Sequence, residues 1–573
     1  MHWWRWAVMA GGIVLLGWIG GLIFDELVRR KLEQVATKAA GVDHRVSIGA
    51  LRSNLWSGSV ELKDLRMEHD SLADDADLTT GLIAIHAERL GLTGVSYRAL
   101  LFGGRIHVAR VEMHAPRVAH VHHSGAPRPV VEPDTATNAL AGLPPSIRLD
   151  SLIIRDASAR TSDLGGKKFS ADVGTLDLWA GGLALHNLPG RGAQFVVNSA
   201  RISIRETTAA FPPLYDLRIG EMWLEHPAGR ANVKDLSFLP RTDQHNYHKL
   251  LDHETDLFMV EVDSIALGGL HVGRFLAEHA LWMRRMDIHR PEVEVYRDKT
   301  MPDAPWKHKP LPTGILRNIT LPMRIDTAIF HHGKVTYHER VEQEHEYGSL
   351  EFTALHGDIT GIASGAPSGR RLELRAHARI YGRSKAFLSY GADLDKPGDA
   401  FSLSAHTTDL PFDIFNQMTD SLLRVEATAG TIHRLELQMT GDDHRGHGTL
   451  HLAYDDLRLA IHITGGKGRD KLLGLLANTA VRSRNVPDLK GYRQGSFAID
   501  RRRDRSLFNF LWQAVKAGSI DTMAPGILRK KASEAGKGPA KADRLGQDKI
   551  RRYGRSASLE SVGGALAIIL PSA

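Results

Sequence analysis

Cysteine is absent from this chain of 573 residues. Its absence excludes disulfide bonds, a thiol nucleophile and a metal site with thiolate ligands. It is compatible with an oxidising compartment, although it does not establish one. Stability must therefore come from a packed core, and an apolar content of 42% is sufficient to form one.

Excess charge is also missing from most of the sequence. The net charge is +7, and residues 529–555 alone contain ten Lys or Arg against three Asp or Glu. The remainder is therefore neutral overall, and the basic character belongs to a C-terminal tail. A neutral body lacks the positive field with which nucleic-acid-binding proteins attract phosphates, so no nucleic-acid partner is expected.

The common signatures of catalysis are missing too. The chain has no Gly-x-Ser-x-Gly nucleophile elbow and no His-Glu-x-x-His zinc motif. The glycine-rich segment 465–468 lacks the Lys-Ser/Thr pair of a phosphate-binding loop. We therefore expect no enzyme, no catalytic residues and no cofactor; a hydrolase would need a convergent carboxylate or histidine site in the folded chain.

Histidine is abundant, with 30 residues, so small clusters are expected by chance. His120 and His122 would point the same way in a strand, but no third metal ligand at suitable spacing accompanies them. A solvated strand face is the favoured interpretation of this pair, and segment 442–447 is typical of a turn before a strand. No metal site is expected.

A long apolar run lies near the N-terminus. Residues 7–24 carry no charge over 18 positions, which is near the lower limit for a transmembrane helix. The run ends without the small-residue cleavage site of a signal peptide, and an amphipathic pattern follows it as far as Gly41. These features favour an uncleaved membrane anchor. The anchor residues, with tryptophans at the interface, are Trp3, Trp4, Trp6, Leu15, Leu16 and Trp18.

The orientation of this anchor stays open. One arginine precedes the run, and Arg29, Arg30, Lys31 and Lys38 follow it. The positive-inside rule would place the body in the cytoplasm, but long domains can translocate regardless of flanking charge.

Strands account for most of residues 42–465. Segments 371–380, 432–439 and 457–463 alternate apolar and polar residues, as strands of an antiparallel sheet do when one face is solvated. The apolar faces either pack beneath a second layer or line an open trough, and periodicity does not separate these alternatives. The residues expected on this face, as candidates to contact lipid, are Leu372, Leu374, Ala376, Ile380, Leu435, Leu437, Leu459 and Ile461.

A long internal repeat organises the body. Segment 110–118 (RVEMHAPRV) returns as 285–293 (RMDIHRPEV), an offset of 175 residues. Repeats of this length indicate like units added edge to edge. We interpret the repeated His114 and His289 as packing residues or strand caps, and the prolines that follow them, Pro116 and Pro291, as strand ends or edge positions.

A second pair of phrases repeats at an offset of 171 residues. Ile48-Gly49 returns as Ile219-Gly220, and the triplet Lys-Asp-Leu at 63–65 returns at 234–236. We interpret both triplets as turns between strands.

Few helices interrupt the strands. Apolar periodicity predicts helices over 411–424, 469–478 and 506–517, and proline-rich loops are expected near 125–145 and 298–312. The expected organisation is an anchor with an amphipathic helix (1–40), two β repeats (41–205 and 206–368), a C-terminal β region (369–465), a helical and strand cap (466–528) and a basic disordered tail (529–573).

Several phrases resemble those of AsmA-like proteins. The anchor is followed by Ile48-Gly49-Ala50-Leu51 and then by GSVELKDL at 58–65, which is similar to the opening of that family. Later phrases at 409–411, 429–432, 448–457 and 502–512 are also similar. The resemblance implies a mostly β fold: an elongated, curved antiparallel β-groove built from repeats, with one N-terminal transmembrane helix and a few short amphipathic helices. It further implies an inner-membrane protein whose body lies in the periplasm.

Two functions are expected from these observations. The first is a non-catalytic role in phospholipid transport or outer-membrane homeostasis, in which the sheet shields the acyl chains of a phospholipid or a similar lipid. The alternative is a structural or assembly factor that binds an outer-membrane protein without carrying lipid. A partner or a second copy of itself is one way for a chain of this length to cross the periplasm. The basic tail suits contact with anionic headgroups, and a solvated tail fits its composition equally well.

Overall fold

The structure is a computed structural model. It describes residues 44–54, 57–69, 82–96, 106–122, 146–163, 169–188, 192–243, 246–341, 347–365, 369–423, 425–461 and 481–524, together with residues 25, 26, 29, 30, 33 and 367. The described part is mostly β: twenty strands form a mostly antiparallel sheet, and the helices are few and short. The chain divides into two compact units, residues 1–236 and 237–573.

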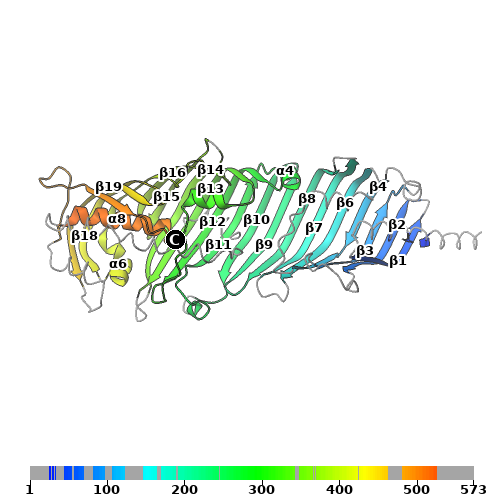
Figure 1. Cartoon of the computed structure of the whole chain (residues 1–573), viewed down its shortest axis with the longest axis horizontal. Helices are drawn as coiled ribbons and strands as arrows, with labels where there is room; N and C mark the ends of the chain where they lie inside the picture. Colours follow the sequence, from blue (N-terminus) through cyan, green and yellow to red (C-terminus); the bar gives the residue numbers. More distant parts are fainter. Residues whose placement is uncertain are drawn as a thin grey trace, which may run out of the picture. The chain divides into compact units, whose positions relative to one another are not determined.

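The first unit consists of long strands. They are β1 (His44–Asn54), β2 (Ser59–His69), β3 (Leu82–Thr93), β4 (Ile106–His114), β5 (Arg117–His122), β6 (Ser146–Asp163), β7 (Ser170–Leu188), β8 (Gly192–Phe211), β9 (Tyr215–His226) and the start of β10 (Arg230–Pro240). Strand β8 runs through residue 205, where the sequence had suggested a boundary between repeats. The strands lie side by side in Figure 1 and pair antiparallel, except that β4 and β5 run parallel to β6.

Carboxylates of the preceding helical residues accept hydrogen bonds from backbone N–H groups of β1, the first strand of this unit. Asp25 accepts a hydrogen bond from the backbone N–H of Ser53 at 2.9 Å, and Glu33 accepts one from the N–H of Ile48 at 3.3 Å. Satisfying such donors reduces the tendency of an exposed strand to recruit another chain.

The second unit combines strands with helices. Its elements are η1 (Tyr247–Lys249), β11 (Leu257–Gly268), α4 (Val272–Glu278), β12 (Leu281–Asp298), α5 (Pro312–Asn318), β13 (Met323–Arg340), β14 (Gly348–Ala363), β15 (Arg371–Ile380), β16 (Ser384–Asp393), β17 (Phe401–Pro411), η2 (Phe412–Phe415), α6 (Asn416–Leu423), β18 (Val425–Gly441), β19 (Arg445–Ile461), β20 (Gly495–Asp500) and α8 (Leu507–Met523). Strands β13 to β20 pair in sequence order and antiparallel, whereas β12 and β13 are parallel.

The internal repeat corresponds to the same strand arrangement in both units. In the first copy β3 pairs antiparallel with β4 and β5, which pair parallel with β6. In the second copy β11 pairs antiparallel with β12, which pairs parallel with β13. Parallel neighbours require a long crossover connection. The two crossovers fall where proline-rich loops were predicted, and the second of them contains α5.

The repeated prolines mark irregularities inside the sheet, so the prediction that they end pairing is wrong for the second copy. Strand β12 continues through Pro291, which pairs with Val262 of β11. The residue before each proline has a left-handed backbone, with φ of 47° at Ala115 and 46° at Arg290. The pairing register is the same on both sides of this residue, so it marks a local interruption of the ladder, where proline can lack a hydrogen bond.

The repeated Lys-Asp-Leu triplets are also inside strands, which corrects their interpretation as turns. Asp64 lies in β2 with φ of 53°, and Asp235 lies in β10 with φ of 52°. A Cβ atom placed on Gly49 or Gly220 would lie 3.0 Å from the Cβ atom of the facing aspartate. Each triplet therefore contains a left-handed residue within a strand, packed tightly against a glycine. Turns and left-handed positions within strands both favour aspartate, which is why the sequence pattern did not distinguish them.

Helices cover the apolar face of the sheet in the second unit. Helix α8, orange in Figure 1, packs on β19 and β20, and α6 packs on β13, β14 and β18. The ring of Phe510 in α8 lies edge-on to Phe401 of β17. These contacts bury much of the core of this unit.

The predicted helices fall into three groups. The helix expected over 411–424 is present as η2 and α6, and the helix expected over 506–517 is α8, which begins after the N-cap Ser506 and continues to Met523. Segment 469–478 lies outside the described residues. The expected anchor, with Trp3, Trp4, Trp6, Leu15, Leu16 and Trp18, also lies outside them. Among the helices that are described, none has the length and apolar character needed to cross a membrane.

Candidate functional site

An unbroken row of apolar side chains crosses the first unit. Each of eight strands contributes one residue, and the cross-strand registers place each directly opposite the next. We call this set the apolar row: Leu51, Leu62, Leu90, Met113, Ile154, Leu178, Ile202 and Leu224. At about 4.8 Å per strand the row extends on the order of 30 Å, comparable with the hydrocarbon thickness of a bilayer.

A second apolar row runs beside the first. Its members, again paired by register, are Val60, Leu92, Val111, Leu152, Ala180 and Ala200. Because Ala180 and Ala200 have small side chains, this row presents less apolar surface at β7 and β8 than at the other strands. Together the two rows give the sheet of the first unit a continuous apolar face.

The apolar face of the first unit is not covered by a described helix. All members of the apolar row except Leu62 are half-buried. The described residues of this unit contain no helix that packs across β3–β9, and the contacts of these strands are made with neighbouring strands. This arrangement differs from that of the second unit, where α6 and α8 cover the corresponding face.

The opposite face of the same strands is charged. Asp177 of β7 accepts a hydrogen bond from Arg205 of β8 at 3.2 Å, and Glu221 of β9 accepts one from Lys234 at 2.8 Å. The hydrogen bond to Glu221 raises the pKa of Lys234 above its usual value. The two faces of this sheet therefore differ sharply in polarity, and only one of them suits a hydrocarbon ligand.

The residues predicted to face lipid lie in the second unit. The predicted alternation is present: Leu372, Ile380 and Leu437 are 5%, 7% and 3% exposed, so they are part of the protein core. Leu437 pairs with Leu450, and Gly518 of α8 lies directly over Leu450, so this part of the face is covered by protein. The half-buried candidates on the same strands are Leu374, Ala376, Leu435 and Leu459, whereas the side chain of Ile461 lies outside the described residues. Contact of any of these residues with lipid remains a prediction.

The sequence analysis did not name the apolar row because its strands are less regular. A left-handed residue such as Asp156 in β6 shifts the alternation partway along the strand. A signal was nevertheless present in Leu176, Leu178 and Ala180 of β7 and in Ile202 and Ile204 of β8. The segment from residue 146 to residue 226 also has no helical pattern that could supply a cover.

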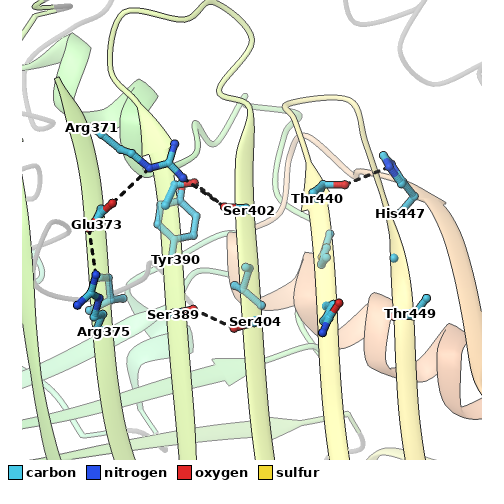
Figure 2. Close-up of a pocket in the computed structure, with 16 residues that line it drawn as sticks. Arg371, Glu373, Arg375, Ser389, Tyr390, Ser402, Ser404, Thr440, His447 and Thr449 are labelled. Carbon is cyan, nitrogen blue, oxygen red and sulfur yellow. Dashed lines mark hydrogen bonds and ion pairs between the residues drawn. The ribbon is translucent and has the colours of Figure 1, made fainter. Parts of the chain in front are cut away.

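The polar face of the second unit is hollowed. A depression of about 540 Å³ is lined by residues of β15 to β19, and Figure 2 shows polar side chains of these strands, among them Ser389 and Ser404, beside one another. Ser389 and Ser404 form a hydrogen bond across β16 and β17 at 2.9 Å, and Thr440 bonds to His447 at 3.0 Å. Arg371 and Arg375 both approach Glu373 within 3.5 Å, so the guanidinium groups are partly neutralised.

A buried ionic cluster joins the segment before α8 to the sheet of the second unit. Arg297 contacts Glu254 at 3.1 Å and Asp256 at 3.0 Å, and Arg505 also bonds to Glu254. Burial would lower the pKa of Arg297, but the facing carboxylates outweigh it and raise that pKa. Asp443 similarly accepts hydrogen bonds from Arg501 and His308 at 2.7 and 2.9 Å. These buried ion pairs hold the C-terminal segment in place.

The predicted histidine and turn segments have ordinary partners. His120 bonds to the hydroxyl of Thr161 at 3.1 Å, and the side chain of His122 lies outside the described residues. Asp442 accepts hydrogen bonds from the backbone of His444 and Arg445, which forms the predicted turn before β19. Within the described ranges, no group of three or more His, Asp or Glu side chains is arranged to hold a metal ion.

Comparison of the sequence with known protein families finds no match, and comparison with curated proteins finds none either.

Proposed function

We propose that this protein binds the acyl chains of phospholipids on the apolar face of its first unit and assists their movement between membranes. The observation that carries the proposal is the apolar row, eight apolar side chains on eight strands with no described helix across β3–β9. A continuous apolar surface that is only half-buried usually marks a binding site.

The energy of such binding follows from the transfer of methylene groups out of water. Each buried CH₂ contributes about 0.8 kcal/mol, so a chain that covers only part of the row would bind usefully. A row of similar side chains does not select one acyl chain, because dispersion and hydrophobic contacts have no directional requirement. This suits a carrier of many phospholipids.

The placement of this activity rests on the sequence. The apolar run at 7–24 and the resemblance to AsmA-like proteins support a single-pass anchor in the inner membrane with the body in the periplasm. A reporter enzyme that is active only in the periplasm, fused after residue 573, tests the orientation. Reporter activity supports this placement, whereas an inactive but stably expressed fusion contradicts it.

The lipid-binding proposal is tested by extracting the purified full-length protein and identifying bound lipid by mass spectrometry. The double variant Leu178→Asp/Ile202→Asp places two carboxylates at neighbouring positions of the apolar row and should lose most of the co-purifying phospholipid. Thr175→Asp/Ser203→Asp is the matched control, because it adds the same charges to the opposite face of the same strands. Equal lipid content in both variants would sink the proposal.

The alternative function is an assembly factor that binds an outer-membrane protein through the same sheet. It predicts that no preparation contains phospholipid and that neither the wild-type chain nor the variant moves lipid. It also predicts that the Leu178→Asp/Ile202→Asp variant loses a protein partner in cross-linking experiments. Transfer of a fluorescent phospholipid between vesicles, measured with the wild-type chain, separates the two functions.

A further inference from the structure

A row of aromatic rings crosses the polar face of the second unit. His289 of β12 stacks on His331 of β13, with ring centroids 4.6 Å apart. The same row continues through β14 to β17, where each ring contacts the ring on the next strand. We call this set the ring row: His289, His331, His332, His356, His377, Phe387 and His406.

The ring row presents its edges to solvent. The rings of His356 and His377 are 5.3 Å apart and nearly parallel, and those of Phe387 and His406 are 4.7 Å apart with an angle of 14°. Because neighbouring rings occupy one another's faces, those faces are largely unavailable for stacking on a sugar. The imidazole nitrogens at the ring edges are left to make polar contacts.

Five members of the ring row line a second depression, of about 610 Å³, on the same face: His331, His356, His377, Phe387 and His406. Hydrogen-bond donors from neighbouring positions share it, among them the guanidinium of Arg375 and the hydroxyl groups of Ser389 and Ser404. One carboxylate, Asp358, also lines it. Guanidinium and protonated imidazole form charge-assisted hydrogen bonds to phosphate oxygens, and hydroxyl groups add neutral ones.

Fixed charges of both signs lie next to the ring row, and the protonation of the histidines adds to them. The strand registers place carboxylates and cations on the same face. Three ion pairs are among them, Arg285 with Asp287, Arg375 with Glu373 and Arg434 with Glu436. The remaining charged neighbours are Asp358, Arg379 and Lys385. Asp287 already contacts His331 at 2.9 Å, and His451 lies beyond Glu436 in the register.

We propose that the ring row between β13 and β17 is a binding site for a phosphate-bearing anion, which binds together with protons. Imidazolium groups about 5 Å apart repel one another, so the empty row resists full protonation. An anion with several phosphate oxygens relieves this repulsion and forms charge-assisted hydrogen bonds to the ring edges. The site is on the polar face and does not depend on the acyl-chain site of the first unit.

The central ring has the environment that this coupling requires. Burial lowers the pKa of His356, and the nearby His332, His377 and His331 lower it further. At neutral pH this imidazole is therefore neutral. A bound anion counteracts the effect of the neighbouring histidines, so the ring takes up a proton when the anion binds.

The test is isothermal titration calorimetry of the full-length protein with sodium tripolyphosphate between about pH 5.5 and pH 8, the range in which histidine titrates. Titrations in buffers of different ionisation enthalpy measure the protons taken up with the ligand. We expect the affinity to rise roughly tenfold or more toward the acid end, with net proton uptake. Affinity that is independent of pH, or binding without proton uptake, would overturn the proposal.

Two variants and a matched control locate the site. His356→Gln/His377→Gln/His406→Gln should abolish proton uptake and reduce affinity at acid pH to its value at alkaline pH. The control His271→Gln/His279→Gln/His444→Gln removes three exposed histidines of the same unit that lie outside the ring row and should behave as wild type. If the first variant does not fold, His377→Gln/His406→Gln changes only exposed rings and should lose most of the proton uptake. Wild-type binding in a folded ring-row variant contradicts the proposal.

A second arm distinguishes a free phosphate compound from a lipid headgroup. Vesicles of phosphatidylcholine with and without phosphatidylglycerol are mixed with the protein at acid pH and sedimented. Binding that needs phosphatidylglycerol and the ring-row histidines identifies a lipid headgroup as the source, whereas binding of tripolyphosphate alone identifies a soluble one. A protein that binds neither tripolyphosphate nor the vesicles contradicts a phosphate site. So does a protein that binds only Ni²⁺ when this ion is titrated in the same way.

Discussion

At the residue scale, the sheet depends on side chains that tolerate a left-handed backbone within strands. The five aspartates that share this role have φ between 50° and 54°. They are Asp64, Asp156, Asp235, Asp409 and Asp456. Asparagine and aspartate accept this region more readily than other residues with a Cβ atom, because their short side chains bond to nearby backbone. Each of them interrupts the regular backbone of its strand. The pairing register shifts beside Asp156 and Asp456, whereas it is unchanged beside Asp64 and Asp409.

Asp235 provides a test of this role. Asp235→Val should reduce the free energy of unfolding by about 1–3 kcal/mol, because a β-branched residue is strained at positive φ. Asp235→Gly is the control and should cost little, since glycine adopts φ near 52° without strain. Denaturant unfolding followed by circular dichroism measures both variants. Equal losses would show that the side chain of Asp235 matters more than its backbone conformation.

His356 makes a prediction about pH. Its pKa is lowered in the folded chain, so below its unfolded value of about 6.5 the unfolded state binds the proton more readily than the folded state. The protein should therefore lose stability as pH falls from about 6.5 toward the lower, folded pKa. His356→Gln should weaken this dependence, as thermal unfolding at a series of pH values would reveal. An unchanged dependence in the variant would assign the effect to other groups.

At the scale of elements, helix α8 determines which apolar face is closed. Ser506 accepts a hydrogen bond from the N–H of Asn509 and caps the helix, and Leu507, Phe510 and Ala514 are buried against strands. Gly518 allows α8 to approach β19, since a Cβ atom there would lie 2.6 Å from the Cβ of Leu450. The contact is close because the helix carries no side chain at this point.

Gly518→Ala should destabilise the protein by about 1–3 kcal/mol through overpacking. Gly273→Ala in α4 is a matched control, because nothing lies within 4 Å of the added methyl group. Alanine is the better helix former, so the control should be neutral or stabilising by about 0.5–1 kcal/mol. Denaturation midpoints of the two variants should therefore move in different directions, and a parallel shift would refute the packing argument.

At the scale of the whole molecule, the two compact units differ in whether described helices cover the apolar face of their strands. In the first unit the apolar face is free of described helices and supports the proposed lipid site. In the second unit α8 and α6 close the apolar face, and the accessible chemistry lies on the polar face, where the ring row is. The closure of the second unit relies on the ionic cluster around Arg297, which ties the segment before α8 to the sheet.

Arg297→Met should cost about 3–5 kcal/mol, because it leaves Glu254 and Asp256 buried without this partner. Arg371→Met is the control: this arginine also has two carboxylate partners, Glu373 and Asp393, but lies on the surface. Exposed pairs contribute about 0–1 kcal/mol. Chemical denaturation of both variants checks the difference, and similar losses would contradict a special role for the buried cluster.

The sequence by itself determined the mostly β fold, the alternation of strands such as β15 and the helices α6 and α8. These features depend on local periodicity, which a strand or helix expresses wherever it lies. It also revealed the internal repeat, because the two copies preserve their residues. Only the tertiary structure decided that Pro291 and Asp235 lie within strands, since a left-handed residue inside a strand differs from one in a turn only in what pairs beside it. It alone showed that Leu437 is covered while Leu178 has no described helix over it, and that six histidines of distant sequence meet in one row. Burial and cross-strand register depend on which segments become neighbours in the folded chain. The residue pattern within one segment does not specify those neighbours.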